Sequence, residues 1–201
     1  MKMTHTNKKR NTGKMVKISI LVAMAFLLGF IQIPIIPIAP WLKVDLSDVP
    51  ILIGAFVFGP VTGILLEFLK CLLSFLTGSQ SGGVGELADF LVGLSLILPA
   101  SFIYFKSKSK KTAVLGMSIG IILMIIVGIL ANVYILLPLY GMKMVGAKLT
   151  EYIVWGLIPF NLIKGLIISA ITYVLYKKLS HSLFKVESGL TKKENLKEVT
   201  N

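Results

Sequence analysis

The hydrophobic residues of this chain fall into long apolar runs separated by short polar segments. The first run extends from Ile18 to about Pro37. Pro34, Pro37 and Pro40 end it, because proline lacks the N–H group and clashes with the preceding helical turn. Runs of this length are typical of spanning helices. We therefore predict an all-α integral membrane protein, a bundle of six transmembrane helices whose later members cover residues 48–59, 61–76, 86–105, 113–137 and 152–176.

The composition supports a membrane protein and excludes several other classes. Hydrophobic residues make up 55% of the 201 positions and charged residues 15%, with a mean hydropathy of +0.85. About 110 apolar side chains suffice for about five or six spans. A soluble enzyme, a disulfide scaffold and a disordered chain are excluded. The one cysteine, Cys71, lies inside an apolar run, so we expect neither an internal disulfide nor a metal site.

The positive charge is a topology signal. The formal net charge is +12, and 16 of the 21 Lys and Arg residues lie in residues 1–17, in the loop 106–111 or after Tyr176. The positive-inside rule places these three segments, and both termini, in the cytoplasm. Basic motifs interleaved with aromatic residues are absent, so we expect no nucleic-acid partner. We divide the chain into a disordered basic cytoplasmic arm (1–17), a six-helix membrane domain (18–177) and a polar cytoplasmic tail (178–201).

Three polar residues inside the later runs are the strongest candidates for a binding site. Asn161 and Lys164 are three residues apart and share a helix face, and Asn132 lies at a similar depth in the preceding run. No acid lies in the helix of Lys164, and a buried unpaired ammonium costs several kcal/mol, so a polar group must meet it. Two amides and an amine suit a polyhydroxylated ligand. The alternative is hydrogen bonding between helices.

The remaining intramembrane charges have structural interpretations. Glu67 and Lys70 share a helix face, and we favour a self-neutralised pair. Glu86 and Asp89 open the next run, where they can cap the helix or contact a ligand. Asp48 is expected to be the N-cap of its own helix. Trp41, Tyr140, Tyr152 and Trp155 fit an interfacial belt, although one or two can stack on a flat ring.

Missing motifs limit the mechanism. The chain has no GxxxxGK[ST] motif for ATP, no HExxH and no GxSxG, and its histidines, His5 and His181, lie in the polar arms. We therefore predict that it is not an enzyme and has no energy source of its own. Ala25 and Gly29 form a small-xxx-small face on the first helix, which suits packing inside the bundle or docking of a partner.

Three segments together resemble a known family. LKVDLSDVPILIGAFVFGPVTGILLEFLK (42–70), GGVGELADFLVG (82–93) and PFNLIKG (159–165) closely resemble the riboflavin-specific S component, or substrate-binding subunit, of energy-coupling factor (ECF) vitamin transporters. The likeness extends from the first helix to Tyr176. It implies a six-helix bundle that holds the vitamin near the extracellular side, under the loop between the first two helices. It also implies a T component and two cytosolic ATP-binding subunits as partners.

The resemblance assigns roles to individual residues. It implies that Asn132, Asn161 and Lys164 bind riboflavin, with Asp45 and Leu46 from the covering loop and Glu86 as a further contact. It implies that Ala25 and Gly29 dock on the T component. Because riboflavin is neutral, Lys164 still needs an acidic neighbour, for which we expect Glu67 or Glu86.

The functional expectation is a riboflavin-binding subunit of an ATP-driven importer in the plasma membrane of a bacterium. Riboflavin is then the transported ligand, and no cofactor or metal is expected. Two alternatives stay open: an S component for another vitamin, such as thiamine or pantothenate, and a stand-alone secondary carrier.

Overall fold

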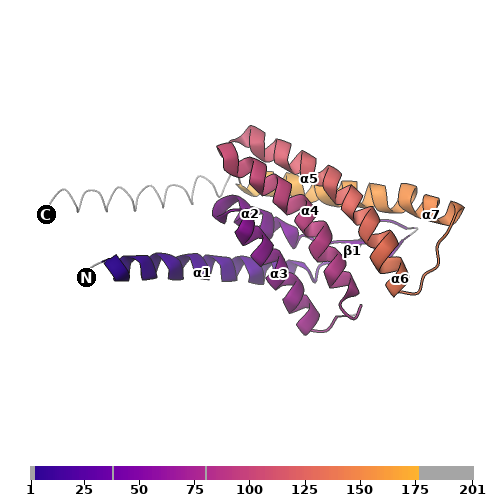
Figure 1. Ribbon diagram of the computed structural model, residues 1–201, viewed down its shortest axis with the longest axis horizontal. Helices are drawn as coiled ribbons and strands as arrows, with labels where there is room; N and C mark the ends of the chain where they lie inside the picture. The colour runs from indigo at the N-terminus through magenta and orange to yellow at the C-terminus, as the bar shows by residue number, and fades with distance from the viewer. Residues whose placement is uncertain (1–2, 38, 80, 177–201) are drawn as a thin grey trace.

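The protein is a bundle of helices, shown in Figure 1 by a computed structural model that describes residues 3–37, 39–79 and 81–176. The N-terminal half contains α1 (Met3–Leu28), a short antiparallel pair of strands, β1 (Ile33–Pro34) and β2 (Lys43–Val44), then α2 (Asp48–Phe58) and α3 (Pro60–Leu76). The C-terminal half contains α4 (Val84–Ser107), α5 (Lys110–Ala131), the π-helical turn η1 (Asn132–Leu136), α6 (Leu137–Leu139), α7 (Ala147–Glu151) and a second π-helical turn, η2 (Tyr152–Leu157). Helix continues from η2 through residues 158–176, and we call Ala147–Tyr176 the last helix.

Among the described residues, three helical stretches are long and apolar enough to cross a membrane. They are Val84–Ser107, Lys110–Leu139 and the last helix, whereas α2 is shorter. The fold is thus largely helical, as predicted, and the number of six spans stays a prediction. A capping box begins α5, in which the Ser109 side chain accepts from the Thr112 N–H and the Thr112 side chain accepts from the Ser109 N–H.

The first helix differs from the prediction at both ends. It begins at Met3, so residues 3–17, expected to be disordered, are helical. It ends at Leu28 rather than near Pro37, because the chain then turns into β1, which pairs Ile33 with Val44 of β2. The predicted polar tail, 178–201, lies outside the described residues.

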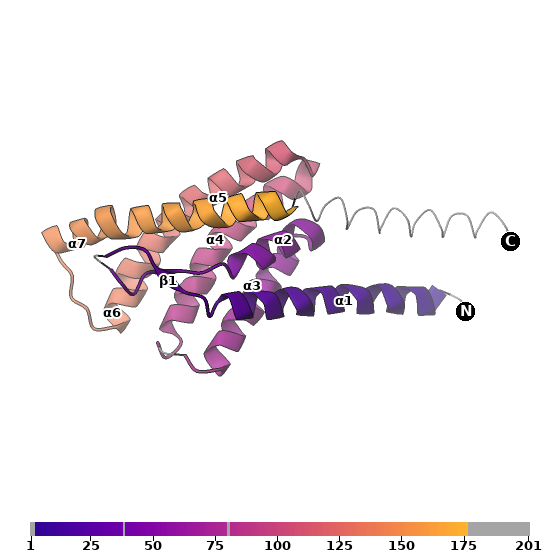
Figure 2. The same cartoon turned by 180° about the vertical axis from the view of Figure 1, so that it is seen from behind.

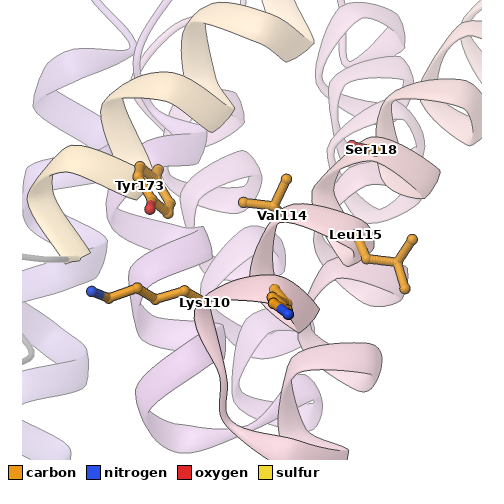
Figure 3. Close-up of a pocket in the computed structure, with 6 residues that line it drawn as sticks. Lys110, Val114, Leu115, Ser118 and Tyr173 are labelled. Carbon is orange, nitrogen blue, oxygen red and sulfur yellow. The ribbon is translucent and has the colours of Figure 1, made fainter.

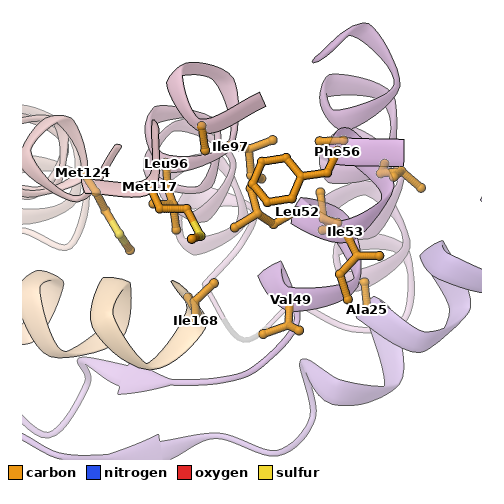
Figure 4. Packing of buried hydrophobic residues seen from close by; sticks show 14 of the residues in the cluster. Ala25, Val49, Leu52, Ile53, Phe56, Leu96, Ile97, Met117, Met124 and Ile168 are labelled. Carbon is orange, nitrogen blue, oxygen red and sulfur yellow. The ribbon is translucent and has the colours of Figure 1, made fainter. Parts of the chain in front are cut away.

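The main core lies between α1, α2, α3, α4, α5 and the last helix (Figure 4). Close approach of α4 and α5 depends on two glycines. A Cβ atom on Gly116 would lie 2.8 Å from the Ala100 carbonyl oxygen, and one on Gly120 would lie 2.7 Å from that of Leu96. Small residues of this kind let membrane helices pack backbone against backbone. The buried side chains include Ala25, Leu52, Phe56, Leu96, Ile97, Met117, Met124 and Ile168.

A second apolar cluster lies under the segment between α1 and α2, residues 29–47 without 38, which we call the covering segment. Figure 2 shows this segment, with β1, between α1 and the last helix. Its buried side chains pack against η2 and the start of the following helix, so the segment closes one end of the bundle. The cluster contains Ile36, Ala39, Leu42, Val44, Leu137, Tyr152, Leu157 and Phe160.

The opposite end of the bundle carries lysines from two of the basic segments. The Lys14 ammonium lies 5.8 Å from the centroid of the Phe58 ring, and that of Lys108 lies 4.9 Å from the Phe105 ring. Phe105 in turn lies close to Gly59, at the turn between α2 and α3. The basic arm and the 106–111 loop therefore share one end, which agrees with the charge pattern. The side of the membrane on which this end lies stays a prediction.

Candidate functional site

A chain of hydrogen bonds joins the covering segment to the two π-helical turns. The Trp41 indole N–H donates to the Tyr152 hydroxyl at 3.2 Å, and that hydroxyl donates to Asn132 Oδ1 at 2.9 Å. The Asn132 amide donates to the Gly128 carbonyl at 2.8 Å. Asn132 begins η1 and Tyr152 begins η2. π-helical turns are rare in proteins as a whole, but those that occur often lie at functional sites. The contact between η1 and η2 therefore marks a candidate site.

Asn161 lies on the other side of Gly128. Its amide donates to the Leu157 carbonyl at 2.8 Å, and its side chain is buried. A Cβ atom on Gly128 would lie 2.6 Å from Asn161 Nδ2, so only glycine leaves room for this amide. The carbonyl of the same glycine holds Asn132. Asn132 and Asn161, both predicted from the sequence, thus contact the same residue of α5, Gly128.

Lys70 lies at the centre of a cluster of buried acids. Its ammonium is 2.7 Å from Glu67, 2.8 Å from Asp89 and 3.1 Å from Asp48. It also donates to the Ser47 hydroxyl at 3.3 Å. The predicted Glu67–Lys70 pair is therefore present, but it belongs to a larger network that joins α2, α3 and α4.

Lys164 belongs to the same network. Its ammonium lies 3.2 Å from Asp89, 3.4 Å from Asp48 and 3.8 Å from Asp45. The expectation that Glu67 or Glu86 neutralises Lys164 is wrong. Asp89 instead bridges the two lysines, with one oxygen on each. We call the following six residues the ion cluster: Asp45, Asp48, Glu67, Lys70, Asp89 and Lys164.

The ion cluster carries four carboxylates against two ammonium groups. Its members are buried except for Asp89, whose side chain is 31% exposed. Asp45 comes from the covering segment, where one carboxylate oxygen accepts from the Ser47 N–H at 2.8 Å. Burial raises the pKa of the Asp45 carboxyl above its ordinary value, and the nearby Lys164 offsets part of that rise. The covering segment therefore has a charged contact to the last helix beside the apolar one.

Local packing explains how so many charges fit between helices. A Cβ atom on Gly93 of α4 would lie 2.5 Å from Glu67 Oε1, so this glycine makes space for the carboxylate. Asp48, expected to be an N-cap, is the first residue of α2, and Ser47 is the N-cap. The Asp48 carboxylate contacts both lysines instead. Charge pairing across helices outweighs capping because the ammonium groups of both lysines are buried and need a charged partner.

Glu67, Cys71 and Asp89 have the spacing of a metal site, since their ligand atoms all lie within 4.8 Å of one another. The Lys70 ammonium, however, lies within 3 Å of both carboxylates and already supplies the positive charge. This trio is therefore explained as part of a salt-bridge network.

The other two predicted ligand contacts, Glu86 and Leu46, belong neither to the hydrogen-bond chain of Trp41, Tyr152 and Asn132 nor to the ion cluster. Glu86, in the first turn of α4, accepts from the Ser79 and Ser81 hydroxyls at 2.8 Å each, so it orders the loop before its helix. Leu46 is half-buried and packs against the main core. Their roles in binding stay predictions.

Of the predicted small-residue pair, Ala25 lies in α1, whereas Gly29 follows the end of that helix and begins the covering segment. Ala25 is fully buried in the main core. Gly29 is half-buried, and a Cβ atom there would lie 3.8 Å from Ser47 Cβ. Ala25 thus packs inside the bundle, and the docking role of both residues stays a prediction.

Sequence reasoning did not assign Asp89 and Asp48 to the site of Lys164, although both acids lie in the segments that carry the family resemblance. The signal for them was the unpaired Lys164 together with the acids at the starts of two other helices. Trp41 and Tyr152 were assigned to a belt, and the structure shows them bonded to the site.

Known proteins resemble the chain over most of its length. Residues 13–176 match the family model for the ECF transporter, substrate-specific component. The riboflavin transporter RibU of Staphylococcus aureus (strain TCH60) is 42% identical over 177 residues, 86% of this chain and 93% of that protein. The riboflavin transporter FmnP of Bacillus subtilis (strain 168) is 33% identical over 173 residues, 83% of this chain and 91% of that protein. A solved structure of the S component of a bacterial ECF transporter matches with a TM-score of 0.76 at 43% identity, over 86% of this chain and 98% of that one.

Proposed function

The chain belongs to the substrate-specific components of ECF transporters, and on that premise we propose that it binds riboflavin for import into a bacterium. Relatives named as riboflavin transporters support this ligand. In this proposal the chain is a multi-pass protein of the cell membrane with both termini in the cytoplasm. A T component and two cytosolic ATP-binding subunits complete the importer, because the chain has no ATP-binding motif of its own.

The observation that carries the proposal is the meeting of Asn132, Asn161 and Tyr152 under the covering segment. The amides and the hydroxyl offer donors and acceptors, which suit the ribityl hydroxyls of riboflavin. The apolar cluster beside them, with the Trp41 and Tyr152 ring centroids 6.0 Å apart and the rings tilted by 43°, suits the flat tricyclic ring. A buried mixture of this kind is what a neutral, amphipathic vitamin requires.

Lys164 has a defined role in this arrangement. Its charge is neutralised by Asp89 and Asp48, so the ammonium can donate a further hydrogen bond to a neutral ring or ribityl oxygen. Asp45 and Leu46 of the covering segment, and Glu86 at the start of α4, complete the proposed contacts. Closure of the covering segment would exclude water from the ligand.

The test uses the colour and fluorescence of riboflavin. Full-length protein purified from vitamin-supplied cells should carry flavin absorbance, and titration of ligand-free protein should quench flavin fluorescence. Protein that stays colourless and quenches nothing would refute the proposal. Displacement of flavin by thiamine or pantothenate would indicate another vitamin. Uptake into vesicles by this chain alone, driven by an ion gradient, would indicate a secondary carrier.

Two substitutions test the residue assignment. Asn161→Ala and Lys164→Ala should each weaken riboflavin binding by about 1–3 kcal/mol, the cost of a lost buried polar contact. Lys106→Ala removes an exposed lysine at the other end of the bundle and should leave binding unchanged. Unchanged affinity in both site variants would remove these residues from the site without removing the ligand.

A further inference from the structure

An open groove of about 460 Å³ lies between the start of α5 and the last helix (Figure 3). The start of α5 and the covering segment lie at opposite ends of the bundle (Figure 2). Lys110 and Val114 are one turn apart on α5, and Figure 3 shows them on the side of α5 nearer to Tyr173 of the last helix. Ser118 continues the same stripe one turn further. The full lining is Lys110, Lys111, Val114, Leu115, Ser118 and Tyr173.

The two lysines lie at the start of a candidate membrane span. Lys110 is the first residue of α5 and of the apolar stretch Lys110–Leu139, which is long enough to span a bilayer. Both lysines are exposed, and within the described part of the chain neither makes an ion pair. In the first turn of α5, the Thr112 N–H is bound by the Ser109 side chain in the capping box. The groove therefore offers two unneutralised ammonium groups at lipid headgroup level.

The polarity of the groove changes with depth. At 1.5 Å of rise per residue, Val114 lies about 6 Å and Ser118 about 12 Å further along α5 than Lys110. Val114 and Leu115 are each about half exposed, at 47% and 54%, so the wall below the lysines is an uncovered apolar surface. A ligand that fits must be anionic at one end and hydrocarbon at the other.

We propose that this groove binds one anionic phospholipid, with its phosphate on Lys110 and Lys111 and an acyl chain along Val114. Basic pockets between spanning helices at the positive end of a membrane protein have this chemistry. A free phosphate ion would use the lysines and leave the apolar wall uncovered, whereas a zwitterionic lipid would bring a second cation to the lysines. The site is independent of riboflavin and of the proposed vitamin contacts.

The experiment measures lipid retention by the full chain. The purified, delipidated protein is titrated with phosphatidylglycerol or with phosphatidylcholine of the same acyl chains, and bound lipid is counted by native mass spectrometry. We expect one phosphatidylglycerol to bind in preference to phosphatidylcholine. The double variant Lys110→Gln/Lys111→Gln should bind it about 30-fold more weakly, the fold-change expected for two lysines at an anionic headgroup.

Two further variants separate a lipid site from a generally basic surface. Lys17→Gln/Lys106→Gln removes the same charge from exposed positions outside the groove and should retain the lipid. Val114→Trp keeps both lysines but fills the groove, so it should lose the lipid. Circular dichroism and thermal unfolding check that each variant is folded.

Several results would overturn the proposal. Equal losses in the two lysine variants would indicate a diffuse charge effect, and equal retention of the two lipids would indicate no headgroup selection. Competition by glycerol phosphate as strong as that by the lipid would indicate a phosphate site without an acyl chain. Loss of assembly with the other transporter subunits in Val114→Trp, with lipid retention unchanged, would assign the groove to a protein contact.

Discussion

Asp89→Asn is the sharpest test of how the ion cluster holds Lys164. Asp89 accepts from Lys70 at 2.8 Å and from Lys164 at 3.2 Å, one carboxylate oxygen to each. Asparagine has nearly the same shape but no charge, and it keeps one oxygen acceptor. Lys70 retains Glu67 and Asp48 after this change. Lys164 is left with contacts at 3.4 and 3.8 Å, so the substitution affects it most.

The magnitude follows from the bonds that are lost. A hydrogen bond to a charged group contributes about 1.5–3 kcal/mol, and a neutral one about 0.5–1.5 kcal/mol. In Asp89→Asn the two ion-pair bonds are replaced by one bond from a charged ammonium to a neutral amide oxygen, so about one charged bond is lost, at about 1.5–3 kcal/mol. Two features of the ion cluster reduce the stability lost in Asp89→Asn. The cluster has two more carboxylates than ammonium groups, and the Asp89 side chain is 31% exposed to solvent. We expect a net loss of about 2 kcal/mol in the free energy of unfolding.

Riboflavin affinity should fall as well, because Lys164 loses its nearest anchor and no longer has a fixed position. We expect a loss of about 1–2 kcal/mol, or about 5–30-fold in Kd. The assays are thermal unfolding in detergent and flavin fluorescence titration. Glu151→Gln, an exposed acid outside the cluster, is the matched control. If Asp89→Asn leaves both the unfolding temperature and the affinity at control values, Asp89 does not hold Lys164 and the reasoning is refuted.

Two further substitutions test the polar site around Gly128. Gly128→Ala should weaken riboflavin binding and destabilise the fold by about 1–3 kcal/mol, because the added Cβ would lie 2.6 Å from Asn161. Gly13→Ala is the control, because open space surrounds Gly13. If the two variants behave alike in flavin titration and in thermal unfolding, the proposed packing of Asn161 against Gly128 is contradicted. Tyr152→Phe should leave Asn132 Oδ1 without its donor and cost about 1–3 kcal/mol of stability. It should also change the fluorescence of Trp41, whose N–H loses its acceptor, and an unchanged spectrum together with unchanged stability would argue against the hydrogen-bond chain.

The sequence predicted the helical segments well where polar, glycine or proline residues mark both ends of the apolar run. The run 61–76 matches α3, and the run 86–105 matches α4 to within a few residues. The first helix was misplaced because its polar N-terminal part is helical without being apolar. The π-helical turns η1 and η2 were not predicted, because both lie in runs that are apolar at nearly every position, so no polar face is present whose shift would show the extra residue.

For the candidate binding site, the sequence likewise predicted some residues and missed others. Asn132, Asn161 and Lys164 were found from the sequence, because a polar residue in an apolar run stands out whatever surrounds it. The partners of Lys164 were not found. Asp89 is 75 residues away from it along the chain, and the predicted helices offered Asp48, Glu67 and Glu86 as well.

The sequence by itself determined that this is a helical membrane protein, which positions in its spans are polar, and the family to which it belongs. The tertiary structure alone decided that Asp89 bridges two lysines, that Asp48 pairs with them instead of capping its helix, and that Ala25 faces the core. The reason is that helix formation and apolar patterning depend on neighbours within one or two turns. Which carboxylate meets which ammonium depends on how four helices and the covering segment pack, and on the glycines that let them approach.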